Sequence, residues 1–136
     1  MKKIFCLFIT LGITISFVLG CVKKEEVTKK YYSSGELLEE IIYKKGTRDG
    51  VSKEYFESGA LKAKMPIRND QLNGMTMVYY ESGSPRAAVP FQNNKAEGVA
   101  SLYYENGTLH FENTYKEGIL IHREEYDESG NLISEK

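Results

Sequence analysis

From residue 31 onwards, apolar and polar residues alternate within short segments, and glycine-containing stretches separate these segments. When the glycine of each stretch is taken as an origin, apolar residues recur two, six and eight positions later. In the second unit these residues are Leu61, Met65 and Ile67, which follow Gly59, and the positions between them are largely polar. Even spacing is the period of a β-strand, in which neighbouring side chains point to opposite faces. The pattern therefore predicts strands with one apolar face and one solvated face.

The glycine-containing stretch occurs five times and makes the chain a repeat array. In each unit an aromatic residue opens the stretch and a glycine closes it; the opening residues are Tyr31, Tyr55, Tyr79, Tyr103 and Tyr126, and the glycines are Gly35, Gly59, Gly83, Gly107 and Gly130. These glycines lie 24, 24, 24 and 23 residues apart, and a fixed period in this range is typical of repeat folds. Eleven residues after each of the first four glycines stands a residue that tolerates a left-handed backbone, namely Gly46, Asp70, Asn94 and Gly118.

These signals predict an all-β fold, an antiparallel β-hairpin repeat array that runs on as the meander of one elongated, twisted sheet. A tight turn joins the two strands of each hairpin. The array is expected over residues 31–136, as about four units and a partial, polar C-terminal cap. Pro66 and Pro90 occupy the same position inside the first strand of their units. Because proline has no N–H, we expect a bulge or a locally unpaired stretch there.

Residues 1–20 have the layout of a secretory signal peptide, which we expect to be helical. Two lysines precede an apolar run that extends to Val18, and the small residue Gly20 stands before Cys21. The four residues that end at Cys21 resemble the lipobox of bacterial lipoproteins. The resemblance implies cleavage before Cys21 and attachment of lipid to its thiol. An uncleaved membrane helix from Ile4 to Gly20 is the alternative.

Residues 21–30 are expected to form the lipidated start of the mature chain and a flexible tether, because their charges are mixed and show no hydrophobic periodicity. Such a tether spans at most about 30 Å, so a partner would be met near the membrane surface. The expected location is the bacterial cell envelope, with the chain anchored by lipid. Val22 follows Cys21 where an aspartate would stand in an inner-membrane lipoprotein, and the resemblance therefore implies the outer membrane in a cell that has one.

Charge and side-chain chemistry narrow the functional classes. Without residues 1–20 the chain has 16 basic and 19 acidic residues, a net charge of −3, and this balance gives no electrostatic basis for binding nucleic acid. Both cysteines, Cys6 and Cys21, precede the repeats, which therefore contain no disulfide. His110 and His122 are the only imidazoles, and we interpret both as surface residues. We expect no catalytic residue, no cofactor and no metal site, and hence no enzyme.

The aromatic pairs are the main candidate for a binding surface. Neighbours in a strand point to opposite faces, so the pairs should form two rows. We interpret the first row, which begins at Tyr31, as packing between repeats. The second row contains Tyr32, Phe56, Tyr80 and Tyr104. Two interpretations of it stay open: an exposed surface for sugars, peptides or another sheet, and further packing between repeats.

Two segments of the array resemble a known family. Residues 103–109 read aromatic–aromatic–Glu–Asn–Gly–Thr–Leu, and residues 43–50 read Tyr–Lys–Lys–Gly–Thr–Arg–Asp–Gly. They resemble the MORN-variant repeat of bacteria, and the resemblance covers residues 31–134, with departures at Pro85, at Asn113 and in the shortened fourth unit. It implies stacked hairpins in an elongated, twisted sheet that acts as a scaffold for protein or membrane contact. Some bacterial relatives carry the label of antitoxin.

The expected function is that of a membrane-anchored repeat lipoprotein, a scaffold that binds another protein or an envelope component. Its expected partners are the membrane, through the lipid anchor, and a protein of unknown identity, and self-association stays open. One alternative is an antitoxin or immunity-type protein that neutralises a toxin. The other is a carbohydrate-binding or enzyme-accessory module that uses the second aromatic row.

Overall fold

The computed structural model describes residues 25–136, and the expectations for the signal peptide and for Cys21 lie outside these residues. The described part is entirely β-structure, in 13 strands. They are β1 (Glu25–Tyr31), β2 (Leu37–Lys44), β3 (Thr47–Arg48), β4 (Gly50–Tyr55), β5 (Leu61–Arg68), β6 (Gln71–Leu72), β7 (Gly74–Tyr79), β8 (Pro85–Gln92), β9 (Lys95–Ala96), β10 (Gly98–Tyr103), β11 (Leu109–Lys116), β12 (Ile119–Tyr126) and β13 (Leu132–Glu135). Within this part of the chain, no helix is long and apolar enough to cross a membrane.

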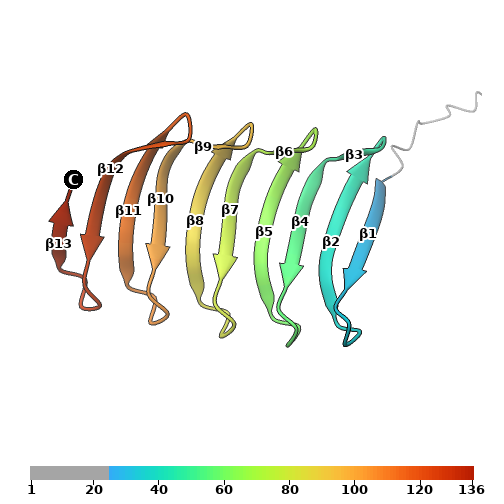
Figure 1. Ribbon diagram of the computed structural model, residues 1–136, viewed down its shortest axis with the longest axis horizontal. Helices are drawn as coiled ribbons and strands as arrows, with labels where there is room; N and C mark the ends of the chain where they lie inside the picture. Colours follow the sequence, from blue (N-terminus) through green and yellow to red (C-terminus); the bar gives the residue numbers. More distant parts are fainter. Residues whose placement is uncertain (1–24) are drawn as a thin grey trace, which may run out of the picture.

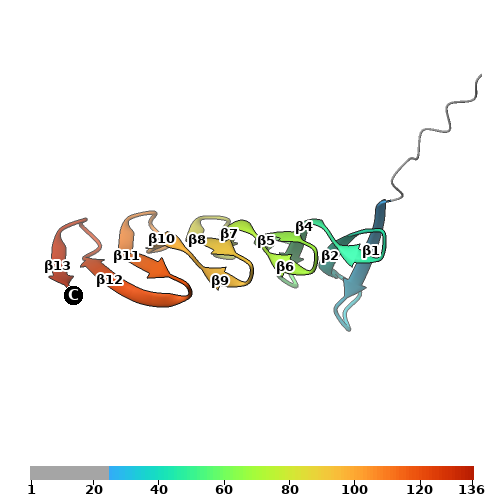
Figure 2. The same cartoon turned by 90° about the horizontal axis from the view of Figure 1, so that it is seen from above.

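All strands belong to one antiparallel sheet in which strands that follow one another in the chain are neighbours in space. The sheet order is β1-β2-β4-β5-β7-β8-β10-β11-β12-β13, and the short strands β3, β6 and β9 branch from β2, β5 and β8. Figure 1 shows the result, an elongated row of hairpins whose two edge strands are β1 and β13. Seen from above, the row is a single layer along its length (Figure 2). The predicted all-β hairpin meander is confirmed.

The turns at one end of the strands contain two consecutive residues with positive φ. In the second hairpin these are Asn69 (φ 49°) and Asp70 (φ 65°). Two positive φ angles define the type I′ turn, whose twist matches that of the flanking strands. The same geometry recurs at Lys45–Gly46, Asn93–Asn94 and Glu117–Gly118. Asparagine, aspartate and glycine tolerate this backbone, which explains why these residue types recur at a fixed distance from the preceding glycine.

The five glycines of the aromatic stretches form the turns at the other end. Their φ angles lie between 85° and 98°. In the second unit the Gly59 amide donates to the Phe56 carbonyl (2.9 Å), and the Phe56 amide donates to the Ala60 carbonyl (2.8 Å). The stretch is therefore a closed return turn between hairpins, and positive φ makes glycine the residue of choice at its corner.

Pro66 and Pro90 lie where the ladder is broken on one side only. On the β4 side, Pro66 is in register with Val51, and the pairing of β5 is continuous from Ala63 to Ile67. On its other side β5 pairs with β6 and then with β7, and Met65 and Pro66 fall in the gap between the two ladders. The Pro66 carbonyl accepts from the Asn73 amide across this gap (2.9 Å). Because N–H and C=O of one strand residue point to the same side, the missing N–H faces the gap, and the predicted local loss of pairing is confirmed.

A second set of glycines lies at this gap in the ladder. Gly74 begins β7 beside Pro66 and has φ 126°. A Cβ at this position would lie 3.1 Å from the Pro66 Cβ. Gly50 is in the equivalent position, where a Cβ would meet the Ile42 side chain at 3.0 Å. The fourth unit has no such glycine, and its second strand, β12, runs uninterrupted with a register shift opposite Thr114 and Tyr115.

The structure corrects the prediction for part of the tether. Glu25–Tyr31 form strand β1, which pairs along its length with β2, and the sheet therefore begins earlier than the predicted residue 31. All seven residues of β1 are exposed. Most of them are charged or polar, and the sequence signal of this strand is the position of Val27 and Tyr31, 24 residues before Val51 and Tyr55. Its position depends on backbone pairing and on cross-strand ion pairs such as Lys30 with Glu39 (2.7 Å).

All buried side chains lie on one face of the sheet, here called the inner face. Residues in register across a ladder share a face, and the pairings place all of the following on the same one. They are Ile41, Ser52, Ala63, Ile67, Thr76, Ala100 and Asn113. Asn113 is 2% exposed and accepts a hydrogen bond from Arg123 Nε (2.8 Å). The core is thus thin and partly polar, as expected of a single layer that has no second layer against it.

Candidate functional site

The second aromatic row links neighbouring repeats through its hydroxyls. Each tyrosine of the row donates to the carbonyl of the first-row tyrosine one repeat on. These bonds are Tyr32 Oη to the Tyr55 oxygen (2.7 Å), Tyr80 Oη to Tyr103 (2.8 Å) and Tyr104 Oη to Tyr126 (3.0 Å). Phe56 stands at the same position without a hydroxyl. All four rings are half-buried, and the structure favours packing between repeats over an exposed aromatic surface.

Side chains of the following strand cover part of this row. His110 stacks on Tyr104, with ring centroids 4.0 Å apart, and also contacts Phe111 at 3.9 Å. The Arg86 guanidinium lies 5.8 Å from the centre of the Tyr80 ring, within the range of a cation–π contact. His110 is therefore a packing residue, half-buried against aromatic rings, and neighbouring side chains lie against two of the four rings of the row, those of Tyr80 and Tyr104.

The row ends where Asp127 replaces its aromatic residue. Asp127 Oδ1 accepts from the amides of Ser129 and Asn131, both at 2.9 Å. These bonds, with those from the Asn131 side-chain amide foremost, hold the pKa of Asp127 below its usual value. A self-contained turn thus takes the place of the aromatic residue that elsewhere reaches the next repeat, and the array is capped at this end.

The opposite face of the sheet, here called the outer face, carries an apolar stripe. Val27, Val51, Met75 and Val99 lie on it and are 53%, 42%, 48% and 46% exposed. All four are spaced by one repeat period of 24 residues, and Val51 and Met75 are in register with Pro66 and Pro90. The "outer stripe" denotes these four exposed residues. Sequence analysis placed no apolar row on this face, because the stripe occupies only one position per unit.

A second row of the outer face crosses ten strands and changes sign along its length. Register assigns to it Lys29, Glu40, Lys53, Lys64, Met77, Ala88, Ser101, Glu112, Glu124 and Glu135. We call it the graded row. It is largely basic near β1, apolar in the middle and acidic near β13. The outer face therefore presents a polarised surface although the chain as a whole has almost no net charge.

Glu40 shows how an acid is accommodated at the basic end of the graded row. Lys29 Nζ lies 3.1 Å and Lys53 Nζ 3.7 Å from its carboxylate, and Tyr55 Oη donates to it at 3.0 Å. The bond from Lys29, followed by the bond from Tyr55, lowers the pKa of Glu40. Desolvation, together with the bond to Glu40, raises the pKa of Tyr55. Tyr31, by contrast, is 58% exposed, so the first aromatic row is covered within the array and open at its start.

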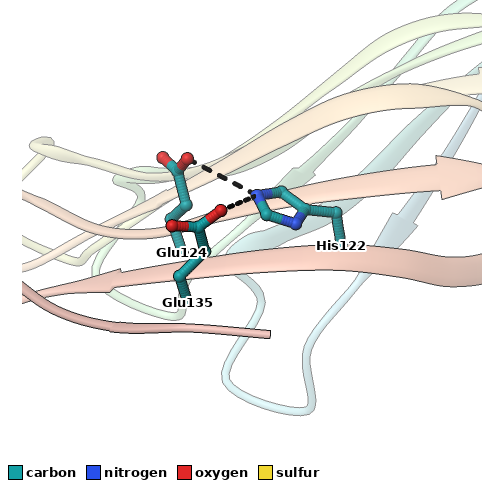
Figure 3. A group of neighbouring side chains, drawn as sticks. All are labelled: His122, Glu124 and Glu135. Atoms are coloured by element: carbon teal, nitrogen blue, oxygen red, sulfur yellow. Dashed lines mark hydrogen bonds and ion pairs between the residues drawn. The ribbon is translucent and has the colours of Figure 1, made fainter.

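At the acidic end, the structure brings together three side chains that sequence analysis did not connect. His122 and Glu124 point to the same face of β12, and Glu135 reaches them from β13, as Figure 3 shows. Ligand atoms of the three residues all lie within 4.8 Å of one another. Tyr126 donates a hydrogen bond to Glu124, which raises the pKa of Tyr126 to about 12. The sequence signal for this cluster was His122 and Glu124, which stand two residues apart on one strand and therefore share a face. The third residue, Glu135, joins them only because β13 pairs with β12.

The fold and its surfaces define an open, single-layer β-hairpin repeat protein whose exposed face is patterned by register. The protein-family model of the MORN repeat variant matches three segments of the sequence, residues 27–45, 48–69 and 96–117. Repeats of this kind are in general non-catalytic modules that bind proteins or membranes. The comparison with curated proteins found no match.

Proposed function

We propose that this protein is an exported, lipid-anchored scaffold that binds another protein through the outer face of its sheet. The observation that carries the proposal is the outer stripe. Half-exposed valine and methionine side chains recur at one repeat period on the face opposite the fully buried side chains. Exposed apolar residues in a continuous arrangement are typical of interaction sites.

The graded row adds direction to this surface. A partner that covers the outer stripe meets lysines near β1 and glutamates near β13. Complementary charges would set the orientation of the partner and speed the encounter more than they would increase affinity. The partner suited to this face is a protein with an apolar strip, acidic at one end and basic at the other.

The proposed anchor is Cys21, four residues before the start of β1. Because β1 is an ordered strand and the predicted tether is correspondingly shorter, lipid on Cys21 would hold the β1 end of the sheet close to the bilayer. The proposed location is the bacterial envelope, at the outer membrane where one exists. An antitoxin or immunity role would use the same outer face, and the identity of the captured partner would reveal it.

Site-specific photo-crosslinking in membranes tests the proposed binding face. A photoreactive residue at Met75 should capture one discrete protein, and one at Val51 should capture the same protein. In a variant that carries the photoreactive residue at Val51 together with Met75→Glu, this capture should be abolished. The same photoreactive residue at Glu81, exposed in a return turn, is the matched control and should capture none. Equal capture from Met75 and Glu81 would contradict the assignment of the outer face.

The anchor is tested separately by labelling cells with a fatty-acid analogue. The wild-type chain should incorporate the label and sediment with membranes, because two or more acyl chains give stable anchoring. Cys21→Ser should abolish labelling. Cys6→Ser should be labelled like the wild type, because Cys6 lies in the segment that the proposed cleavage before Cys21 removes. A mature N-terminus other than a modified Cys21 would overturn the lipoprotein proposal without affecting the binding face.

A further inference from the structure

We propose that His122, Glu124 and Glu135 bind one divalent transition-metal ion, with Zn²⁺ as the test ion, and thereby link the terminal strand β13 to β12. The donors are one imidazole nitrogen and two carboxylate oxygens, a set that suits Zn²⁺ and other first-row ions better than Ca²⁺ or Mg²⁺. The site lies at the acidic end of the graded row, and its test uses the isolated chain without the proposed protein partner.

The spacing of the donor atoms fits a shared ion. His122 Nε2 lies 3.4 Å from Glu124 Oε1 and 3.9 Å from Glu135 Oε1. Two ligands about 2.0–2.2 Å from a tetrahedral Zn²⁺ are separated by about 3.3–3.6 Å. Side chains of this length reach that arrangement by small rotations, and water can occupy the remaining coordination position. The three residues are partly exposed, with 37%, 27% and 60% of their side-chain surfaces accessible in the order named, so an ion can enter from solvent.

One of the carboxylates is already oriented. Tyr126 Oη donates to Glu124 Oε2, while Glu124 Oε1 faces His122. A hydrogen bond to the second oxygen of a ligating carboxylate fixes its direction, and such partners commonly contribute to metal affinity. Tyr126 is thus a positioning residue for this site.

The charge around the cluster is an independent reason to expect a cation. Glu112, Glu124 and Glu135 stand opposite one another on three adjacent strands, and like charges in direct register are destabilising. Within residues 25–136 no lysine or arginine lies in ion-pair distance of any of them, and His122 is the only basic partner. Glu40, in the same graded row, lies between Lys29 and Lys53. The acidic end of the row is where a bound cation would replace the missing lysines.

The consequence for the fold is a stabilised edge. β13 has four residues and pairs on one side only, with β12. Its apolar residues Leu132 and Ile133 are 52% and 58% exposed, so burial contributes little to its docking. An ion held jointly by His122 and Glu135 would add the missing link between the two strands.

Isothermal titration of ZnCl₂ into the chelator-treated, full-length chain tests the proposal. We expect the wild type to bind one ion per chain. The affinity should be at least about tenfold weaker in each of His122→Gln, Glu124→Gln and Glu135→Gln, and about tenfold weaker in Tyr126→Phe. Zn²⁺ should also slow amide exchange in Leu132–Glu135 of the wild type and not of His122→Gln. This second measurement separates a shared ion from a histidine–glutamate ion pair, which exists without metal.

Two controls match these variants. His110→Gln removes the other histidine, and Glu128→Gln removes an exposed carboxylate from the adjacent turn; both should bind Zn²⁺ as the wild type does. Circular dichroism establishes that each variant is folded. Equal binding by His122→Gln and the wild type would mean adventitious metal only and would overturn the proposal, as would wild-type binding that leaves the exchange of β13 unchanged.

Discussion

In the first, third and fourth units, one tyrosine hydroxyl connects neighbouring repeats. Tyr32, Tyr80 and Tyr104 each donate to a backbone carbonyl 22 or 23 residues later. Sequence analysis identified the row and left its role open, because alternation fixes the face of a side chain but not what lies opposite. The distance to the next hairpin depends on the return turn and the sheet twist, and these are tertiary quantities.

The position of Phe56 allows this link to be added as well as removed. Phe56→Tyr should raise the free energy of unfolding by about 0.5–1.5 kcal/mol, because the new hydroxyl can reach the Tyr79 carbonyl as its counterparts do. Tyr80→Phe should lower it by a similar amount. Urea denaturation monitored by circular dichroism measures both. A loss of stability in Phe56→Tyr would show that the second unit is spaced differently from the others.

At the scale of the element, each of the first three units is a hairpin whose pairing with the next strand is interrupted. Pro66 removes one N–H from β5, and Gly74 lets the next strand start against the proline ring. The proline could be interpreted from sequence, since its missing donor is a local property. The reason for Gly74 could not, because the contact joins residues eight apart across a gap in the ladder.

The two glycine columns should therefore respond differently to a methyl group. Gly83→Ala places a Cβ in open space and should cost about 1–2 kcal/mol through its positive φ alone. Gly74→Ala should cost at least about 1 kcal/mol more, because its Cβ would lie 3.1 Å from Pro66. Melting of the two variants in parallel gives the comparison. Equal losses would mean that β7 can move away from Pro66 freely.

At the scale of the whole molecule, the sheet is a one-dimensional array with polarised chemistry. Interior strands pair on both sides, whereas β1 and β13 pair on one. In such arrays each unit contacts only its neighbours, and stability is close to a sum of local terms. The graded row and the outer stripe are properties of this scale, since each contains residues from many strands.

Hydrogen exchange should follow the array. In metal-free protein, amides paired in β5, β7 and β8 should be the most protected, and those of β1 and β13 the least, because edge strands open without disturbing the rest. Mass-spectrometric exchange over minutes to hours measures this profile. Uniform protection from β1 to β13 would instead indicate that the array unfolds as one cooperative unit.

The sequence by itself determined the architecture. A 24-residue period, alternation and turn residues at fixed offsets are local signals, and each unit repeats them, so the hairpins, their turns and their order were all predictable. Sequence analysis missed β1 because its residues are mostly charged, although Val27 and Tyr31 lie one repeat period before Val51 and Tyr55. Only the tertiary structure decided which residues share a row across ten strands. Register is set by turn geometry and by backbone pairing between neighbouring strands, and alternation within one strand does not specify it. It is register that forms the outer stripe, grades the charge and brings Glu135 to His122.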